Sequence, residues 1–198
     1  MREAPMIVRV AQLGDAAELA RLSPSSSPPR TSISKRVSTP SVPPTMREAP
    51  MTIRGAQPGD AAELARLSVQ LGYALTVDQM QKRLAVLLPN ERHYIAVAMS
   101  GSRMLGRVHV EHSSSIEEGE RAELKGLVVD ADARRGGVGR KLVEIAESWA
   151  ASRGLPFLIV RSNVVREIAH PFYLALGYSR EKTQHYYRKA LKGASCRT

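Results

Sequence analysis

The sequence predicts one mixed α/β domain, built on a central sheet of about six to seven strands that is flanked by about four helices. Two observations predict this class. Short runs typical of strands, which are β-branched or alternate between apolar and polar residues, alternate along the chain with amphipathic segments of helical period. Glycine or proline lies at the ends of most of these segments. With 198 residues, 43% of them apolar, the chain can bury one sizeable core.

Individual elements are placed by the spacing of apolar residues and by proline or glycine near their ends. The clearest helix is 138–153, where Val138, Leu142 and Trp149 share one face and Gly154 follows the last turn. The other helices are predicted at 58–72, 77–88 and 165–176. Strands are predicted at 51–55, 93–99, 104–112, 121–130 and 156–160, with a terminal pair over 179–192.

The N-terminal part of the chain contains a duplication. Residues 1–23 recur as residues 46–68 with four differences. Repeat folds generally need at least about three units, so two short copies predict no repeat architecture. The Pro- and Ser-rich residues 24–45 are typical of a disordered linker. We therefore expect the folded domain at 46–198 and interpret 1–45 as a partial duplication plus linker, with a targeting or docking arm as the alternative.

Composition excludes several classes of function. The longest apolar runs are far below the roughly 20 residues that span a bilayer, and charged residues interrupt the N-terminus where a secretory signal needs an apolar stretch. The single cysteine, Cys196, cannot form an intrachain disulfide. A cytoplasmic protein without a membrane partner is expected. Of the net charge of +10, residues 46–198 carry +7, but no aromatic interleaving points to nucleic acid.

The glycine-rich turn after the predicted strand 121–130 is a candidate anion site. Gly136, Gly137 and Gly139 allow close backbone approach at the start of a helix, where the partial positive charge favours anions. Cationic side chains surround this entrance. The turn lacks the Lys-Ser/Thr of a phosphate-binding loop and the spacing of the dinucleotide fingerprint. A glycine turn with a solvated basic rim is the alternative at this point. The cations are Arg134, Arg135, Arg140 and Lys141.

Two motifs together resemble the GCN5-related N-acetyltransferase (GNAT) superfamily. Arg134, Gly137 and Gly139 match its R/Q-x-x-G-x-G/A motif, and Asn163 precedes Phe172–Tyr178, which matches F-Y-x-x-L-G-Y/F. The motifs stand in the family's order with a strand between them, and the resemblance extends over residues 46–198. It implies the GNAT (acyl-CoA N-acyltransferase) fold, with acetyl-CoA as co-substrate and no metal.

The resemblance also implies which residues bind the donor. In the family, the main chain of the strand before the turn pairs with the pantetheine arm, and the turn holds the pyrophosphate. The side chains of that strand are expected in the core in any case, and Asn163 could equally cap a helix. The implied cofactor-binding residues are Leu127, Val128, Val129, Arg134, Arg135, Gly136, Gly137, Val138, Gly139, Arg140 and Asn163.

Transfer to an amine requires a base for the amine and an acid for the leaving thiolate. By resemblance, Tyr173 is the candidate acid, with a packed helix tyrosine as the alternative. Glu123 lies 11 residues before Arg134, at the spacing of a glutamate base in histone-acetylating relatives. A water chain, Glu111 and His112 are its competitors.

These expectations combine into an acetyl-CoA-dependent N-acetyltransferase in which a small-molecule primary amine attacks directly. The acceptor is expected to contact Val69–Leu88 and the region of Tyr186 and Tyr187, neither of which identifies it. The alternatives are a protein or peptide N-acetyltransferase and a non-catalytic acyl-CoA-binding module, and a homodimer is left open. Arg161, Arg166 and His170 are candidates for the mouth of the site.

Overall fold

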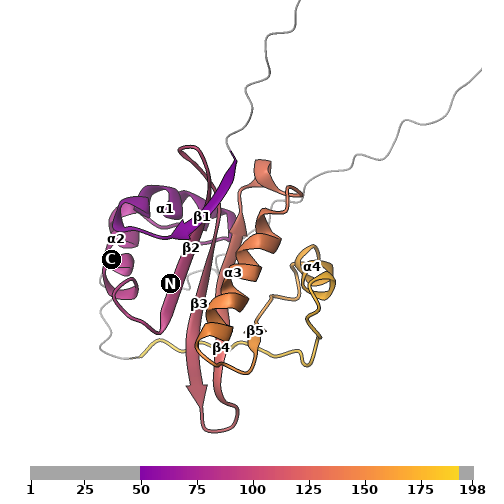
Figure 1. Ribbon diagram of the computed structural model, residues 1–198. Coiled ribbons are helices and arrows are strands. Elements are labelled where there is room, and N and C mark those ends of the chain that lie inside the picture. The colour runs from indigo at the N-terminus through magenta and orange to yellow at the C-terminus, as the bar shows by residue number, and fades with distance from the viewer. Residues whose placement is uncertain (1–49, 192–198) are drawn as a thin grey trace, which may run out of the picture. The chain divides into compact units, whose positions relative to one another are not determined.

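The computed structural model describes residues 50–191. The predictions made for the duplicated segment 1–23, the linker 24–45 and Cys196 therefore lie outside the described residues. Within 50–191, five strands form one mixed sheet, which four α-helices and two short 3-10 helices accompany (Figure 1). The prediction of a mixed α/β domain is confirmed.

Most boundaries lie within a few residues of the predicted ones. The strands are β1 (Met51–Gly55), β2 (His93–Ser100), β3 (Arg103–Ser115), β4 (Gly119–Val129) and β5 (Leu158–Val160). The α-helices are α1 (Ala61–Gln70), α2 (Val77–Leu87), α3 (Val138–Ser152) and α4 (Ala169–Ala175). The 3-10 helices are η1 (Pro58–Asp60) and η2 (Ala131–Ala133).

The sheet has the order β1-β2-β3-β4-β5. The first four strands are antiparallel to their neighbours, and β5 runs parallel to β4. The pairing of β3 with β4 shifts by one residue, because His109 pairs with Gly126 while Val110 pairs with Leu124. Lys125 is thus the extra residue of a β-bulge, a feature that bends a strand and re-aims its side chains.

Two cores lie on opposite faces of the sheet. Ala96 and Ala98 of β2 belong to the core with α3, whereas Ile95 and Val97 belong to the core with α1 and α2. This alternation is the two-residue period of a strand that is buried on both sides. Figure 1 shows α1 and α2 on one side of the sheet and α3 on the other.

The predicted number of strands is wrong, since the sheet has five strands where about six to seven were expected. Over the described part of the expected terminal pair, residues 179–191, there is no helix or strand. The apolar side chains of this stretch do not lie on one face. Tyr186 and Tyr187 are adjacent and would point to opposite sides of a strand, and both are exposed.

Helix α4 is shorter than the predicted 165–176. A helix that began at Val165 would place Pro171 in its interior, where proline removes a backbone hydrogen bond and clashes with the preceding turn. The helix begins at Ala169 instead, so that Pro171 lies in the first turn, where its missing N–H costs nothing. In residues 50–191, no helix is long and apolar enough to cross a membrane.

Candidate active site

Strands β4 and β5 part beside the site. Their pairing covers three positions and ends where Leu124 pairs with Val160, the last residue of β5. Strand β4 continues to Val129 and remains paired with β3 on its other side. Within the described residues, no strand pairs with 125–129 on the β5 side. This free edge is the place where an extended ligand can pair with main-chain groups.

The side chains of this edge are core residues, as the alternative interpretation expected. Val128 is buried in the core with α1, while Leu127 and Val129 pack against the core with α3. The β-bulge at Lys125 causes the reversal, because Ala122 and Leu124 face α3 before it. Side-chain burial and main-chain binding are compatible at these positions.

The turn after β4 contains backbone N–H groups that lie at the start of α3. Arg135 has a φ of 64° and Gly137 a φ of 79°, so both lie in the left-handed region. Gly137 is the N-cap and provides no side-chain cap to the helix, whose first N–H groups lack intrahelical partners. A Cβ at Gly137 would meet nothing within 4 Å. The turn is thus open, accessible and suited to an anion.

Cationic side chains surround this helix start. Arg134, Arg135 and Arg140 are exposed, and the first turn of α3 contains no acidic residue. Arg134 Nε donates a hydrogen bond to the carbonyl of Val129, at 3.4 Å, which ties the turn to the end of β4. Gly136 is exposed beside them, while Val138 is buried and anchors α3 to the core.

The two sequence motifs meet at Gly139. A Cβ at this position would lie 3.3 Å from the ring of Phe172 and 3.5 Å from the Val129 side chain. Glycine therefore lets α4 pack closely on the first turn of α3 and on β4. This contact places α4, which contains Tyr173 next to Phe172, beside the start of α3 and the end of β4.

Tyr173 is enclosed by aromatic rings. Its ring packs edge-on against Phe172, with centroids 5.2 Å apart, and against Tyr178, with centroids 5.7 Å apart. Burial raises the pKa of the Tyr173 phenol, and the charge of Arg166 opposes this only in part. The phenol is therefore held protonated near neutral pH and can donate a proton.

Glu123 lies on β4 just before the strands part, opposite Glu111 of β3. It is 7% exposed. Lys125 Nζ lies 3.2 Å from the carboxylates of both Glu123 and Glu111, and Arg161 Nε lies 3.6 Å from Glu123. His112, the other competitor, faces Glu120 at 3.4 Å. The structure thus places Glu123 at the edge of the site, fixed by cations.

Asn163 lies in the loop between β5 and α4. Its Oδ1 accepts a hydrogen bond from the N–H of Val165 at 3.2 Å, and its carbonyl accepts from the N–H of Arg166 at 2.9 Å. His170 Nε2 lies 3.2 Å from the same carbonyl. Arg166 Nη2 donates to the carbonyl of Leu71 at 2.9 Å, which links this loop to the end of α1. Asn163 thus forms a local turn, and it does not cap α4, whose N-cap is Ile168.

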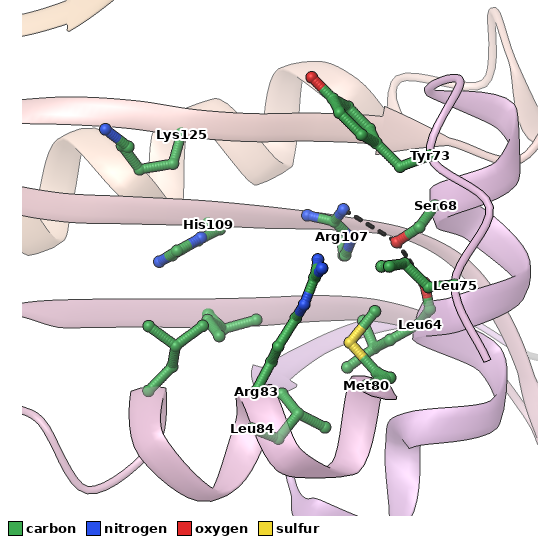
Figure 2. Close-up of a pocket in the computed structure, with 12 residues that line it drawn as sticks. Leu64, Ser68, Tyr73, Leu75, Met80, Arg83, Leu84, Arg107, His109 and Lys125 are labelled. Atoms are coloured by element: carbon green, nitrogen blue, oxygen red, sulfur yellow. Dashed lines mark hydrogen bonds between the residues drawn. The ribbon is translucent and has the colours of Figure 1, made fainter. Parts of the chain in front are cut away.

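A cavity of about 200 Å³ lies between the sheet and the pair α1 and α2 (Figure 2). Apolar side chains of both helices and of β2 form its walls. Several of its residues come from the segment Val69–Leu88, where the acceptor was expected. Sequence reasoning missed Arg107 and His109. Their alternation with Val108 and Val110 places them together on one face of β3, but only the structure shows that helices cover this face. The polar lining residues are Ser68, Tyr73, Arg83, Arg107, His109 and Lys125.

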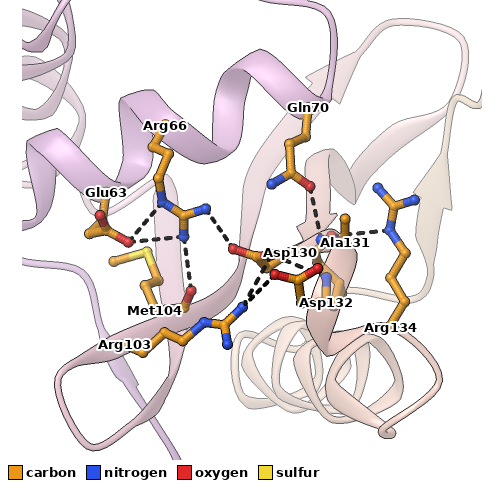
Figure 3. A network of polar contacts seen from close by, with 10 residues as sticks. Glu63, Arg66, Gln70, Arg103, Met104, Asp130, Ala131, Asp132 and Arg134 are labelled. Carbon is orange, nitrogen blue, oxygen red and sulfur yellow. Dashed lines mark hydrogen bonds and ion pairs between the residues drawn. The ribbon is translucent and has the colours of Figure 1, made fainter. Parts of the chain in front are cut away.

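A polar network fixes the end of β4 and the start of the turn (Figure 3). Asp130 is 4% exposed, and Arg66 of α1 donates to it at 2.5 Å. Arg66 also donates to the carbonyl of Met104 in β3 at 3.2 Å. Arg103 lies 3.5 Å from Asp130 and 3.2 Å from Asp132. One carboxylate therefore joins α1, β3 and the turn.

Burial of Asp130 would raise its pKa, but the hydrogen bond from Arg66 and that from the N–H of Asp132 outweigh burial, so the pKa is lowered. A carboxyl group with a lowered pKa in the folded state adds stability above its unfolded pKa, which is about 3.9. That stability is lost as the pH falls through the folded pKa.

Asp130→Asn should reduce the free energy of unfolding at pH 7 by about 1–2 kcal/mol, because the charge-assisted bond is lost while solvent screens the half-exposed Arg66. The matched control is Asp132→Asn, whose carboxylate is 80% exposed and contacts the same Arg103. Urea unfolding at pH 7 and below about pH 4 measures both, with the difference shrinking in acid. Equal reductions in the free energy of unfolding of the two variants at pH 7 would contradict the proposed contribution of Asp130 to stability.

Comparison with known proteins agrees with this geometry. The acetyltransferase (GNAT) family matches residues 64–178, more than half of the chain. An uncharacterised N-acetyltransferase of Bacillus subtilis (strain 168), YhdJ, is 27% identical over 104 residues, which cover 52% of this chain and 73% of the relative.

Solved structures share the fold at lower identity. Glucosamine-6-phosphate N-acetyltransferase from Arabidopsis thaliana has a TM-score of 0.61 and 21% identity, covering 70% of this chain and 98% of that one. AAC(6')-Iy, solved with a CoA bisubstrate analogue, has a TM-score of 0.65 and 19% identity, covering 72% and 100%. The chain therefore belongs to the acetyltransferase (GNAT) family and is an acetyl-CoA-dependent acyltransferase.

Proposed function

We propose that this protein transfers the acetyl group of acetyl-CoA to the primary amine of a small molecule by direct attack. The observation that carries this proposal is the contact of Gly139 with Phe172. It joins the cationic turn, the free edge of β4 and Tyr173 in one place, as a transfer site requires.

The donor would lie along the free edge of β4. Main-chain groups of Leu127, Val128 and Val129 are available for an amide-bearing arm, and the N-terminus of α3 attracts the pyrophosphate. Arg134, Arg135 and Arg140 add charge-assisted contacts to phosphate oxygens. The open backbone at Gly136 and Gly137 permits close approach. Asn163, exposed across the site, is proposed as a further cofactor contact.

The reaction needs two proton transfers, one bond formed and one bond broken. A base takes a proton from the acceptor amine, and the nitrogen then forms a bond to the thioester carbonyl carbon. Collapse of the tetrahedral intermediate breaks the carbon–sulfur bond, and Tyr173 donates its phenolic proton to the leaving thiolate. Glu123 is the proposed base, acting directly or through a water chain. The raised pKa of Tyr173 agrees with an acid that is protonated before the bond breaks.

The small size of the cavity favours a small-molecule acceptor. Its volume of about 200 Å³ is below the roughly 300–1,000 Å³ of pockets that hold drug-sized ligands. Solved relatives are named for action on aminoglycosides and on glucosamine-6-phosphate. A protein or peptide acceptor and a non-catalytic acyl-CoA-binding role are the competing outcomes of the assays below. The 46–198 domain limits, the cytoplasmic location and a homodimer stay predictions.

Gly137→Asp should weaken acetyl-CoA binding by roughly 5- to 30-fold relative to Gly137→Asn, because it places a negative charge at the helix start. Asp and Asn have the same shape and both tolerate the left-handed region, so Gly137→Asn controls for backbone strain. Isothermal titration with acetyl-CoA measures the dissociation constants. Equal affinities in the two variants would remove the turn as the pyrophosphate site.

Tyr173→Phe should lower kcat by roughly 10²-fold or more while the acetyl-CoA affinity changes little, because only the proton donor is removed. Tyr178→Phe is the matched control, since its hydroxyl bonds to Glu147 of α3 at 2.8 Å. Thiol release measures turnover, and thermal unfolding checks that both variants are folded. If Tyr173→Phe retains full turnover, Tyr173 is not the acid.

Glu123→Gln should lower kcat/KM while the acetyl-CoA affinity changes little, because the amide cannot accept the amine proton. Glu111→Gln is the matched control, since both carboxylates contact Lys125 at 3.2 Å. Thiol release measures kcat/KM in both variants. An unchanged kcat/KM in Glu123→Gln would favour a water chain, and a loss confined to Glu111→Gln would move the base to β3.

A further inference from the structure

The cavity beside the proposed transfer site carries uncompensated positive charge. Arg83, Arg107 and Lys125 line it, and no carboxylate is among its lining residues. Lys125 is neutralised by Glu111 and Glu123, whose hydrogen bonds raise its pKa although burial alone would lower it. Two guanidinium groups remain to be paired.

Arg107 projects from the middle of the sheet into the cavity. Its Nη2 donates to the hydroxyl of Ser68 at 3.3 Å, and its buried Nε has no hydrogen-bond partner within residues 50–191. Burial lowers the pKa of Arg107, but a guanidinium is not deprotonated in proteins. A buried donor on a charged group that lacks a partner is costly, so an anion in the cavity would stabilise it.

Arg83 approaches the same point from the helical side. Figure 2 shows its guanidinium extending from α2 toward Arg107 across the cavity. Among the described residues, neither arginine forms an ion pair with a carboxylate. Two guanidinium groups that converge without a carboxylate between them match the planar, bidentate recognition of a carboxylate or phosphate.

The remaining polar groups make the two ends of the cavity different in charge. Burial, then the charges of His93 and Arg107, lowers the pKa of His109 to about 4, so this ring is neutral near pH 7. Lys125, which also lines the cavity, forms ion pairs with Glu123 and Glu111 near the point where the pairing of β4 with β5 ends. The cavity thus has a cationic end at the arginines and carboxylates near the proposed transfer point.

We propose that the acceptor is a small amine that also carries an anionic group, a carboxylate or a phosphate, which Arg83 and Arg107 bind. This inference rests on the proposed acetyl transfer. The anionic group lies at the arginines, the apolar walls enclose the body of the molecule, and the amine points toward Glu123. A large polycationic acceptor fits neither the charge nor the volume of about 200 Å³.

The test compares acceptors that differ only in the anionic group. Leucine is paired with leucinamide for the carboxylate, and phosphoethanolamine with ethanolamine for the phosphate. The anionic member of at least one pair should have a kcat/KM roughly 10- to 100-fold higher in the thiol-release assay. The pair that responds identifies the anion. Equal values within both pairs would overturn the proposal.

Variants locate the anion contact. Arg107→Met and Arg83→Met should each reduce the preference for the anionic member at least severalfold, while acetyl-CoA affinity stays unchanged. Lys82→Met is the control, because Lys82 is the neighbour of Arg83 on α2 and pairs with Asp78 instead. A preference that survives in both arginine variants would contradict the assignment. Because Arg83 is exposed on α2, its variant keeps the test valid if Arg107→Met fails to fold.

Binding separates this proposal from the proposed transfer. Isothermal titration of the four probes into CoA-saturated protein should give tighter binding of an anionic member, and Arg83→Met should abolish that difference. Absence of thiol release with every amine would refute acetyl transfer, while the titration would still decide the anion preference. Thiol release without any anion preference would refute only the inference drawn from the arginines.

Discussion

The short pairing between β4 and β5 is the constraint on which the site depends. Because β5 ends at Val160, the last residues of β4 keep hydrogen bonds with β3 but lose their partner on the other side. Main-chain groups that would be satisfied inside a full sheet become available to a ligand. The β-bulge at Lys125 also determines which way the side chains of this edge point. It turns Leu127 and Val129 toward α3 and lets Val128 pack in the core with α1.

Close packing around this edge determines how precisely the reacting groups are placed. Gly139 lets Phe172 approach the start of α3, and Gly106 lets β3 pass β4, since a Cβ there would lie 2.7 Å from the carbonyl of Val128. Asp130 then fixes the same strand end to α1 through Arg66. The two glycines and the buried carboxylate of Asp130 together hold the turn, the edge of β4 and α4 in fixed positions relative to one another.

Electrostatics divides the site into two parts. Exposed arginines and a helix N-terminus surround the turn, where long-range attraction of a polyanionic donor is useful. In the cavity, the proposed contacts of Arg83 and Arg107 with an acceptor would act at short range and partly out of water, where charge discriminates between ligands. The two proposed anion sites contain five arginines and so contribute to the excess of positive charge in residues 46–198.

Much of this could be predicted from local pattern. The apolar periods place nearly every helix and strand, because helical and strand periods are local properties. The spacing of Arg134, Gly137 and Gly139 indicates an anion site, and only together with the motif Phe172–Tyr178 does its resemblance to the GNAT superfamily imply the donor. The late start of α4 was a missed local signal, since Pro171 is unfavourable inside a helix whatever packs around it. The missing terminal strands were not predictable, since strand pairing depends on what lies alongside. The convergence of Arg83 with Arg107 was hidden for the same reason: only tertiary packing brings α2 against β3 and decides which charges remain unpaired.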